Sequence, residues 1–362
     1  MDNSTSEADI SLNNKASFWR LMWVESSGTK MIVQPDASQL RVGIIGASRV
    51  ATYAMISPAR AVAGVRVVAI AARDPSRAAA YSKLHEIPRV HAFYKDLIAD
   101  SGIDLVYITT PPACHASQAL SAIKAGKPVL VEKPFSMTAA EAKRVNDAAK
   151  ATGVPVIEAM HSLHHALFLR LARILTEGTI GHVRHVRAEF SVPIDENEED
   201  FRWSTDLGGG ALMDLGVYPL AWCRRLLGES FAVESADGAF KRGVDTAFTA
   251  KLRFANAVTA EVTSTMSARG PVAWLQIEGT KGGLHVVNPL APQMGHELRI
   301  STAAGETLEI VDGPSTYEAQ LIAVRNTVMH HAPFPLPADD FLRSMEAIDA
   351  VRAAWKRPEP NS

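Results

Sequence analysis

A regular alternation of short apolar strands and longer helices constrains the first half of this chain more than any other feature. The expected strands cover residues 40–46, 65–72, 104–109, 129–131 and 154–157, and the expected helices 75–85, 94–100, 113–125 and 138–152. Strands that alternate with helices in this way form right-handed βαβ units. The sequence therefore predicts an α/β fold that begins with a parallel sheet.

The second half of the chain has a different pattern. After a helix at 163–177, alternating β-branched segments predict strands at 182–192, 246–254, 258–266, 272–278, 284–287, 297–302 and 306–311. Alternation of this kind is typical of a mostly antiparallel sheet in an α+β domain. Helices at 315–331 and 339–355 are expected to close the chain.

The length of 362 residues exceeds what one ordinary core supports, so we expect separate domains. The polar start of the chain, residues 1–40, is expected to be a flexible N-terminal arm. Residues 41–160 would form the first domain, with the helix at 338–356 packed back on it. Residues 161–337 would form a substrate-binding domain whose broad sheet offers an apolar face for assembly into a homodimer or homotetramer.

Composition excludes several partners. The formal net charge is only -2, so no basic field attracts nucleic acid or an anionic membrane surface. No apolar run approaches the roughly 18 residues that a membrane helix needs. The 2 cysteines lack the spacing of a disulfide framework or a metal site, and they suit a reducing, cytoplasmic environment. His161, His164 and His165 are spaced like metal ligands, but no carboxylate or thiolate accompanies them, so we expect no metal.

A phosphate-binding turn is expected directly after the first strand. The turn consists of Gly46, Ala47, Ser48, Arg49 and Val50. Glycine permits the tight turn, and free amides at the start of the next helix can contact a pyrophosphate. Serine stands where the second glycine of the usual pattern would be, and its hydroxyl could donate to a phosphate oxygen. The alternative is an ordinary tight turn.

The tip of the second strand predicts the choice of cofactor. An NAD-selective site needs a carboxylate there, whereas this chain has Ala72 followed by Arg73. A guanidinium suits the 2′-phosphate of NADP through paired, charge-assisted hydrogen bonds. We therefore expect NADP, with NAD as the alternative, and we expect Asp74 to cap a helix.

A charged pair follows the buried strand at 129–131. Glu132 and Lys133 stand between this strand and Pro134, which ends it. Ligands of open α/β sheets bind beyond the carboxyl ends of the strands, which places the pair at the mouth of a crevice. A surface ion pair that merely caps a strand is the alternative interpretation.

A glycine-rich segment, 208–210, precedes a helix with a second candidate constellation. Asp214 and Tyr218 are four residues apart and therefore share a helical face, and Pro219 is expected to bend the helix there or start it afresh. A carboxylate and a phenol at such an irregularity suit proton transfer. The alternative is a buried tyrosine bonded to a neighbouring aspartate. Residues expected to line the substrate cleft are His161, His165, Arg202 and Trp203.

Together these motifs resemble the glucose–fructose oxidoreductase/inositol dehydrogenase (Gfo/Idh/MocA) family along nearly all of the chain from residue 41. The segments that carry the resemblance are 43–48, Thr110-Pro111-Pro112 with His115, Lys127–Pro134, and 208–214 with Tyr218. With a tyrosine at position 218, the chain resembles the branch of the family that contains dihydrodiol dehydrogenases and NADP-linked xylose dehydrogenases. The resemblance implies an N-terminal Rossmann domain with a parallel sheet and a C-terminal α+β domain with a large, open, mostly antiparallel sheet.

The resemblance also implies roles. Lys133 would lie beside the nicotinamide and the reacting hydroxyl, Tyr218 would give or take the proton, and Asp214 would orient them. Additional cofactor contacts are implied for Thr110, Pro111, His115 and Glu132. The segment 158–165 departs from the family pattern, and only His165 matches it. This leaves the substrate open among polyols, sugars and cyclic diols.

We thus expect an NADP-dependent dehydrogenase or reductase. The alternatives are an aldose–ketose transhydrogenase that keeps its cofactor bound and a non-catalytic NADP-binding sensor.

Overall fold

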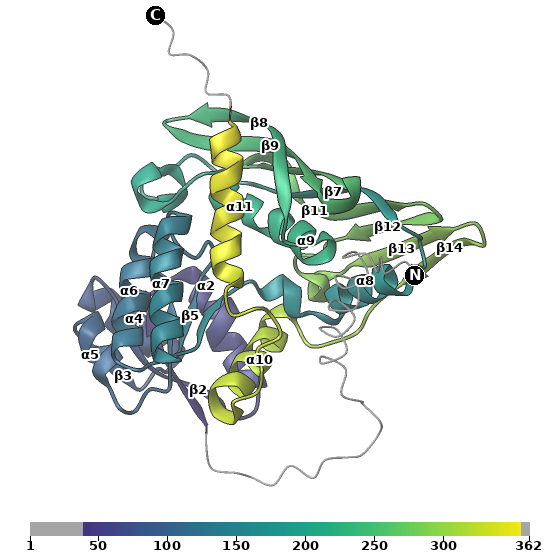
Figure 1. The fold of residues 1–362 in the computed structure, drawn as a ribbon. Helices are drawn as coiled ribbons and strands as arrows, with labels where there is room; N and C mark the ends of the chain where they lie inside the picture. Colours follow the sequence, from purple (N-terminus) through teal and green to yellow (C-terminus); the bar gives the residue numbers. More distant parts are fainter. Residues whose placement is uncertain (1–38, 356–362) are drawn as a thin grey trace, which may run out of the picture.

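The computed structural model describes residues 39–355 and contains two sheets (Figure 1). One is parallel and the other is mostly antiparallel, which confirms the fold class expected from the sequence. The predicted N-terminal arm lies almost wholly outside the described residues.

The first sheet is six-stranded, with the order β3-β2-β1-β4-β5-β6. Its strands are β1 (Leu40–Ile45), β2 (Val65–Ala71), β3 (Arg89–His91), β4 (Leu105–Ile108), β5 (Val129–Val131) and β6 (Val156–Glu158). The helices that connect them are α2 (Arg49–Ala51), the π-helix η1 (Thr52–Ile56), α3 (Ser57–Ala61), α4 (Pro75–His85), α5 (Tyr94–Ala99), α6 (Pro112–Lys124) and α7 (Ala139–Thr152).

The strand order creates one crevice. β1 pairs in parallel with β2 on one side and with β4 on the other, so the direction of the connections reverses between β1 and β4. Ligands of open α/β sheets bind at such a switch point, beyond the carboxyl ends of the strands. The turn that begins at Gly46 and the loop that contains Lys133 both lie at this end of the sheet.

The second sheet is eight-stranded, with the order β14-β13-β12-β11-β7-β10-β9-β8. The β7–β10 pair is parallel and the other pairs are antiparallel. The strands are β7 (Val183–Pro193), β8 (Phe231–Lys241), β9 (Val244–Phe254), β10 (Thr259–Thr265), β11 (Ser267–Gly279), β12 (Gly282–Val287), β13 (Glu297–Thr302) and β14 (Gly305–Glu309).

The remaining helices pack on one face of the second sheet or at the junction, and α10 (Thr316–His330) lies beside the first half of the molecule (Figure 1). They are the 3₁₀ turns η2 (His161–His164), η3 (Phe201–Trp203), η4 (Thr205–Leu207), η6 (Ala255–Ala257) and η7 (Pro292–Met294), the π-helix η5 (Leu212–Gly216), and the α-helices α8 (Ala166–Glu177), α9 (Val217–Leu227), α10 (Thr316–His330) and α11 (Asp340–Ala354).

The free face of the second sheet is more polar than we expected. Val262 and Leu252 are buried on the face that packs on the helices. On the opposite face, the side chains of Thr249 and Thr263 contact each other, and Arg187 pairs with Glu278. Side chains alternate between the two faces of each strand, so burial of the apolar side chains on one face leaves the polar side chains on the other. The prediction of an apolar face for assembly therefore does not hold over β7, β9 and β10.

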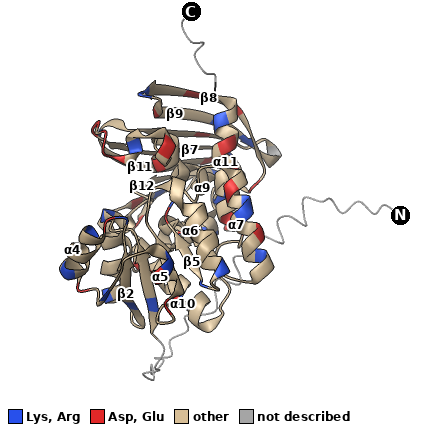
Figure 2. Ribbon diagram, turned by 90° about the vertical axis from the view of Figure 1, so that its left-hand side faces the viewer, with Lys and Arg blue, Asp and Glu red and all other residues tan. Residues whose placement is uncertain are grey.

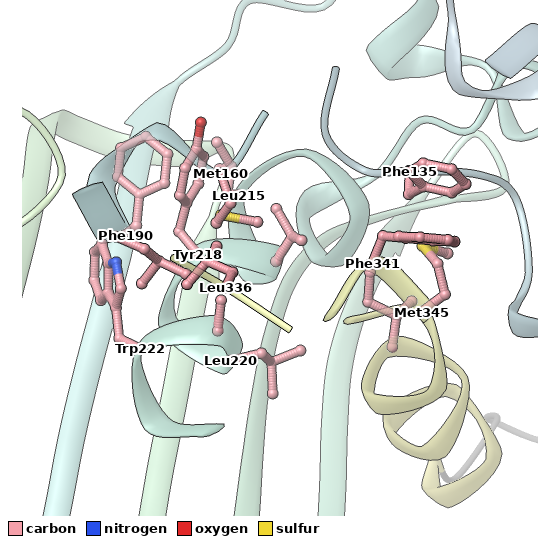
Figure 3. Close-up of a cluster of buried hydrophobic side chains, with 14 of the residues drawn as sticks. Phe135, Met160, Phe190, Leu215, Tyr218, Leu220, Trp222, Leu336, Phe341 and Met345 are labelled. Atoms are coloured by element: carbon pink, nitrogen blue, oxygen red, sulfur yellow. The ribbon is translucent and has the colours of Figure 1, made fainter. Parts of the chain in front are cut away.

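Helix α11 joins the two halves of the molecule. The ring of Phe341 stacks on that of Phe135 at 4.1 Å, and Asp349 accepts a hydrogen bond from Ala139 N at the start of α7 (Figure 3). At its other end α11 runs beside β8. Arg224 of α9, which is buried, donates to Asp340 at 3.1 Å. The last helix thus packs against α7 and β6 of the first half and against β8 of the second sheet.

Sequence reasoning missed the edge strands β3 and β8. β3 has only 3 residues, too few to show a period. β8 contains Glu234, Asp237 and Gly238, residue types that are depleted in strands, and its register against β9 shifts twice. Pairing with β9 overrides this weak local preference.

Within residues 39–355, no helix is long and apolar enough to cross a membrane. Basic and acidic residues are both scattered over the view of Figure 2, including along α11.

We predict that Glu158, the buried last residue of β6, which faces α11, makes stability fall as the pH rises. Burial and the nearby Asp340 raise the pKa of Glu158 to about 8 from 4.5. A raised carboxyl pKa means that the folded state holds the proton more tightly, so the contribution is complete below about pH 4.5 and is lost towards pH 8. Between about pH 5.5 and 7.5, Glu158→Gln should therefore lose about 2 kcal/mol less unfolding free energy than the wild type.

Urea denaturation at both pH values measures this difference. Glu346→Gln, on the exposed side of α11, is the control and should follow the wild type. Parallel behaviour of Glu158→Gln and the wild type would contradict the prediction.

Candidate functional site

The expected phosphate-binding turn adopts the geometry that glycine permits. Gly46 has φ = 109°, and a Cβ there would lie 2.7 Å from Thr109 Oγ1. Ser48 caps the following helix by accepting from Ala51 N at 3.2 Å, and its hydroxyl donates to Thr109 Oγ1 at 2.8 Å. The Ser48 hydroxyl, predicted to donate to a phosphate, is thus engaged with the neighbouring strand end.

Exposed arginines surround this turn. Arg49 begins α2 and Arg73 follows β2, as the sequence predicted. Asp74 caps α4 by accepting from Ser76 N at 2.9 Å, also as predicted. Sequence reasoning missed Arg77, whose guanidinium donates to Ala47 O at 2.9 Å. The turn and the tip of β2 therefore carry positive charge.

Thr110 and Pro111 lie in the loop that follows β4, and His115 lies in the first turn of α6. Pro111 precedes α6, and Thr110 Oγ1 donates to Gln118 at 2.7 Å. The His115 ring is buried between Thr110 O, 2.6 Å from its Nε2, and Pro134 O, 3.0 Å from its Nδ1. Burial lowers the pKa of His115 to about 4, although these carbonyls oppose the shift. His115 thus links the ends of β4 and β5.

Glu132 lies beneath the crevice rather than at its mouth. It is buried and accepts a hydrogen bond from the Tyr107 hydroxyl of β4. Burial raises the pKa of Glu132, although Tyr107 and the adjacent Lys133 oppose that shift. The pair was expected to be either a surface cap or part of a site, and Glu132 is not at the surface.

Lys133 and Asp214 meet across the junction of the two sheets. Lys133 Nζ donates to Asp214 Oδ1 at 2.8 Å and to Asp214 O at 2.6 Å. Arg202 Nε donates to the other carboxylate oxygen at 2.7 Å. Burial opposes ionisation of Asp214, but these two cations outweigh it and lower its pKa to about 2. Asp214 is therefore an anion that positions two cations, not a proton acceptor.

The glycines before Asp214 admit a neighbouring loop. Gly209 N donates to Ser204 O at 2.8 Å and Gly210 N to Arg202 O at 3.0 Å, and a Cβ on Gly209 would lie 2.4 Å from Arg202 O. The loop that carries Arg202 thus occupies the space that the missing side chain of Gly209 leaves open.

Asp214 itself lies in the π-helix η5, and α9 begins at Val217. Single π-helical turns often occur at functional sites. The expected irregularity is present, although it precedes Pro219.

Tyr218 lies between the apolar core and the junction. Figure 3 shows its ring beside Phe190, with the hydroxyl pointing away from Trp222 and Leu220. The hydroxyl is 3.0 Å from His161 Nε2, and Lys133 Nζ is 5.0 Å from the centre of the ring. Burial, with Tyr317 and Glu132 nearby, raises the pKa of Tyr218 well above its ordinary value.

The other predicted substrate residues have different surroundings. His161 is buried behind Tyr218, with Nδ1 2.9 Å from Thr316 Oγ1. His165 caps α8, since its Nδ1 accepts from Leu167 N at 3.0 Å. Trp203 donates to Asp195 O at 2.8 Å and so fixes the loop that carries Arg202. Of the predicted substrate set, His161 and Arg202 adjoin the Lys133–Asp214–Tyr218 group directly.

Sequence reasoning missed an aromatic row that leads from this group to the surface. Tyr317 stacks on His161 at 4.1 Å, and Tyr53, which is 51% exposed, meets Tyr317 edge-on at 5.6 Å. Tyr53 is four residues after Arg49, so helical spacing from the phosphate turn could have indicated it. Thr316 and Tyr317 are more than 150 positions from His161 along the chain, and no local pattern indicates them.

No group of histidine, cysteine, aspartate and glutamate within residues 39–355 is arranged to hold a metal ion. The described residues instead provide a basic turn for an anion, two cations held by one carboxylate, and a phenol beside them. Such a group can orient a hydroxyl or carbonyl oxygen and move one proton to or from it.

Models of known protein families match both halves of the chain. A family model described as "Oxidoreductase family, NAD-binding Rossmann fold" matches residues 40–160, and the "GFO/IDH/MocA C-terminal domain" matches 168–285. A dTDP-3,4-didehydro-2,6-dideoxy-alpha-D-glucose 3-reductase of Streptomyces violaceoruber is 31% identical, over 87% of this chain and 95% of its own. The trans-1,2-dihydrobenzene-1,2-diol dehydrogenase of Bos taurus is 30% identical, over 67% of this chain and 78% of its own.

A solved structure extends the comparison to three dimensions. The 3-ketoreductase KijD10 of Actinomadura kijaniata, in complex with NADP and TDP-benzene, superimposes with a TM-score of 0.80 at 27% identity, covering 88% of this chain and 98% of its own. Sequence models, relatives and fold agree across both sheets. The chain belongs to the GFO/IDH/MocA oxidoreductase family.

Proposed function

We propose that this oxidoreductase transfers a hydride between NADP and a secondary hydroxyl, or the matching ketone, of a sugar or cyclic diol. The observation that carries the proposal is the meeting of Lys133, Asp214 and Tyr218 at the end of β5, at the same edge of the sheet as the phosphate-binding turn. An oxidoreductase site needs a bound dinucleotide and a route for one proton, and this edge offers groups for both.

The residues around the turn fit an anionic dinucleotide. Gly46 leaves no Cβ on its tight turn, and Arg49, Arg73 and Arg77 add positive charge. We assign the pyrophosphate to the turn from Gly46 to Val50 and the 2′-phosphate to Arg73. When bound, NADP supplies the hydride acceptor or donor. The absence of a carboxylate at the tip of β2 and the NADP bound to KijD10 both favour NADP over NAD.

The proton is assigned to Lys133 and Tyr218. Two hydrogen bonds to Asp214 hold Lys133 Nζ in one orientation at the junction, so the ammonium is already positioned before substrate binds. Tyr218 presents its hydroxyl away from the core. A hydroxyl that loses a hydride must also lose its proton, so a phenol and an ammonium at one point suit both directions of the reaction.

The substrate class follows from the relatives and from the site. The named relatives act on a deoxysugar nucleotide and on a cyclic diol. Tyr53 and Tyr317 give this chain an aromatic wall that can pack against the apolar face of a ring. We therefore propose a cyclic substrate. The expectations of a cytoplasmic location and of a homodimer or homotetramer stay predictions, as do the transhydrogenase and sensor alternatives.

Lys133→Met and Tyr218→Phe should each lower kcat/KM by roughly 10²–10⁴-fold, because each removes a group that handles the proton. NADP reduction measured over a panel of aldoses, inositols and cyclic diols provides the assay.

Lys143→Met is the control for this prediction. Lys143 is exposed and pairs with Asp147 four residues along α7, away from the site, so its loss should leave the rate unchanged. Full activity in both site variants would refute the mechanism. An inactive wild type on every substrate would favour the sensor.

Arg73→Ala should raise the KM for NADPH by roughly 10–100-fold, the cost of losing charge-assisted hydrogen bonds. The KM for NADH should change little, because NADH lacks the 2′-phosphate. Arg66→Ala is the matched control, because Arg66 is also an exposed arginine but lies near the start of β2, the strand that Arg73 follows. Equal effects on the two cofactors would remove Arg73 from the 2′-phosphate site.

A further inference from the structure

The surroundings of Tyr218 make its ionisation costly. The phenol is 5% exposed. The titratable groups around it come from every element at the junction and include Lys133, Glu132, Asp214, Tyr53, Tyr317 and His161. Burial and the negative charges of Glu132 and Asp214 all oppose a phenolate. A phenol that takes a proton from a hydroxyl must nevertheless carry that charge.

Lys133 compensates only part of this cost. Its Nζ donates to Asp214 twice, at 2.6 and 2.8 Å, and lies 5.0 Å from the centre of the Tyr218 ring. In this structure the ammonium is paired with the carboxylate of Asp214, so a second donor that faces the phenol oxygen directly would help to stabilise the phenolate.

His161 is in the position of such a donor. Its Nε2 is 3.0 Å from the Tyr218 hydroxyl and its Nδ1 is 2.9 Å from Thr316 Oγ1. Burial and the charge of Lys133 lower the pKa of His161 to about 3, so the ring is neutral and has one donor nitrogen and one acceptor. The partner of Nδ1 therefore decides what Nε2 can do.

Gln293 occupies one lone pair of the Thr316 hydroxyl. Its Nε2 donates to Thr316 Oγ1 at 3.4 Å, while its Oε1 accepts from Thr316 N at 3.3 Å. The Thr316 hydroxyl has one hydrogen of its own to donate, and His161 Nδ1 at 2.9 Å is an acceptor for it. When Thr316 donates to Nδ1, Nε2 carries the ring hydrogen and points it at Tyr218.

We propose that Gln293, Thr316 and His161 are positioning residues that form a one-way hydrogen-bond chain, which keeps a donor on the oxygen of ionised Tyr218. The inference rests on the proposed function, since the hydrogen-bond chain acts when the enzyme oxidises a hydroxyl. In that reaction Tyr218 takes the substrate proton as the hydride leaves for NADP. No proton moves along the chain, and His161 stays neutral throughout.

Thr316→Val tests the chain, because valine keeps the shape of threonine and removes the hydroxyl. The rising limb of kcat/KM against pH for alcohol oxidation, which reports the ionisation of Tyr218, should move up by about one pH unit, and the rate near pH 7 should fall on the order of tenfold. The substrate KM should stay within about twofold, and Thr316→Ser should restore both values. Thr327→Val is the control, since Thr327 is on the same helix and its hydroxyl has no hydrogen-bond partner in the described structure.

¹⁵N NMR of histidine-labelled protein tests the tautomer without any activity. The signal of His161, assigned by its loss in His161→Gln, should show hydrogen on Nε2. Hydrogen on Nδ1, or a Thr316→Val enzyme with the pH profile and kcat of the wild type, would overturn the proposal. A wild type without NADP-linked activity would instead refute the proposed function. The NMR result would still show whether the hydrogen-bond chain has the proposed direction.

Discussion

The site depends on one interaction, the buried ion pair between Lys133 and Asp214. Lys133 follows strand β5 of the first sheet, and Asp214 lies in η5, which packs on the second sheet. A buried charge without its partner would be strongly destabilising. Removing two ions from water is costly, and the cost is offset only when further hydrogen bonds complete the geometry. Arg202 and the backbone carbonyl of Asp214 complete it here. The pair thus fixes where the two halves of the cleft meet, and Tyr218 is placed relative to it.

Backbone conformation delivers Asp214 to this position. Gly210 has φ = 108°, and a Cβ there would lie 2.1 Å from Asp245 Oδ1. The other carboxylate oxygen of Asp245 accepts from Leu212 N at 2.6 Å and so holds the first turn of η5. A side chain at position 210 would displace this carboxylate and with it the π-helix. Glycine at position 210 therefore allows Asp245 to fix the start of η5, the helix that carries Asp214.

The sequence allowed the two sheets, the tight turn at Gly46 and the proximity of Lys133, Asp214 and Tyr218 to be predicted, because periodicity and local motifs carry that information. It did not indicate that Asp214 would be held by Arg202 from the preceding loop, or that Tyr107 would bond Glu132. Those contacts depend on how distant segments pack. His161 illustrates the limit: its proximity to the site was predicted, but its place behind the phenol depends on Thr316, far along the chain.

The position of α11 has a consequence for how the chain folds during synthesis. Phe135 and the buried face of α7 are covered by residues such as Phe341 and Met345, which leave the ribosome among the last of the described chain. Until then the first sheet has its strands and helices but exposes an apolar surface. Domains generally fold as units from the N-terminal end, and exposed apolar surface makes intermediates prone to aggregate. Truncation of the last helix would therefore damage the N-terminal half first.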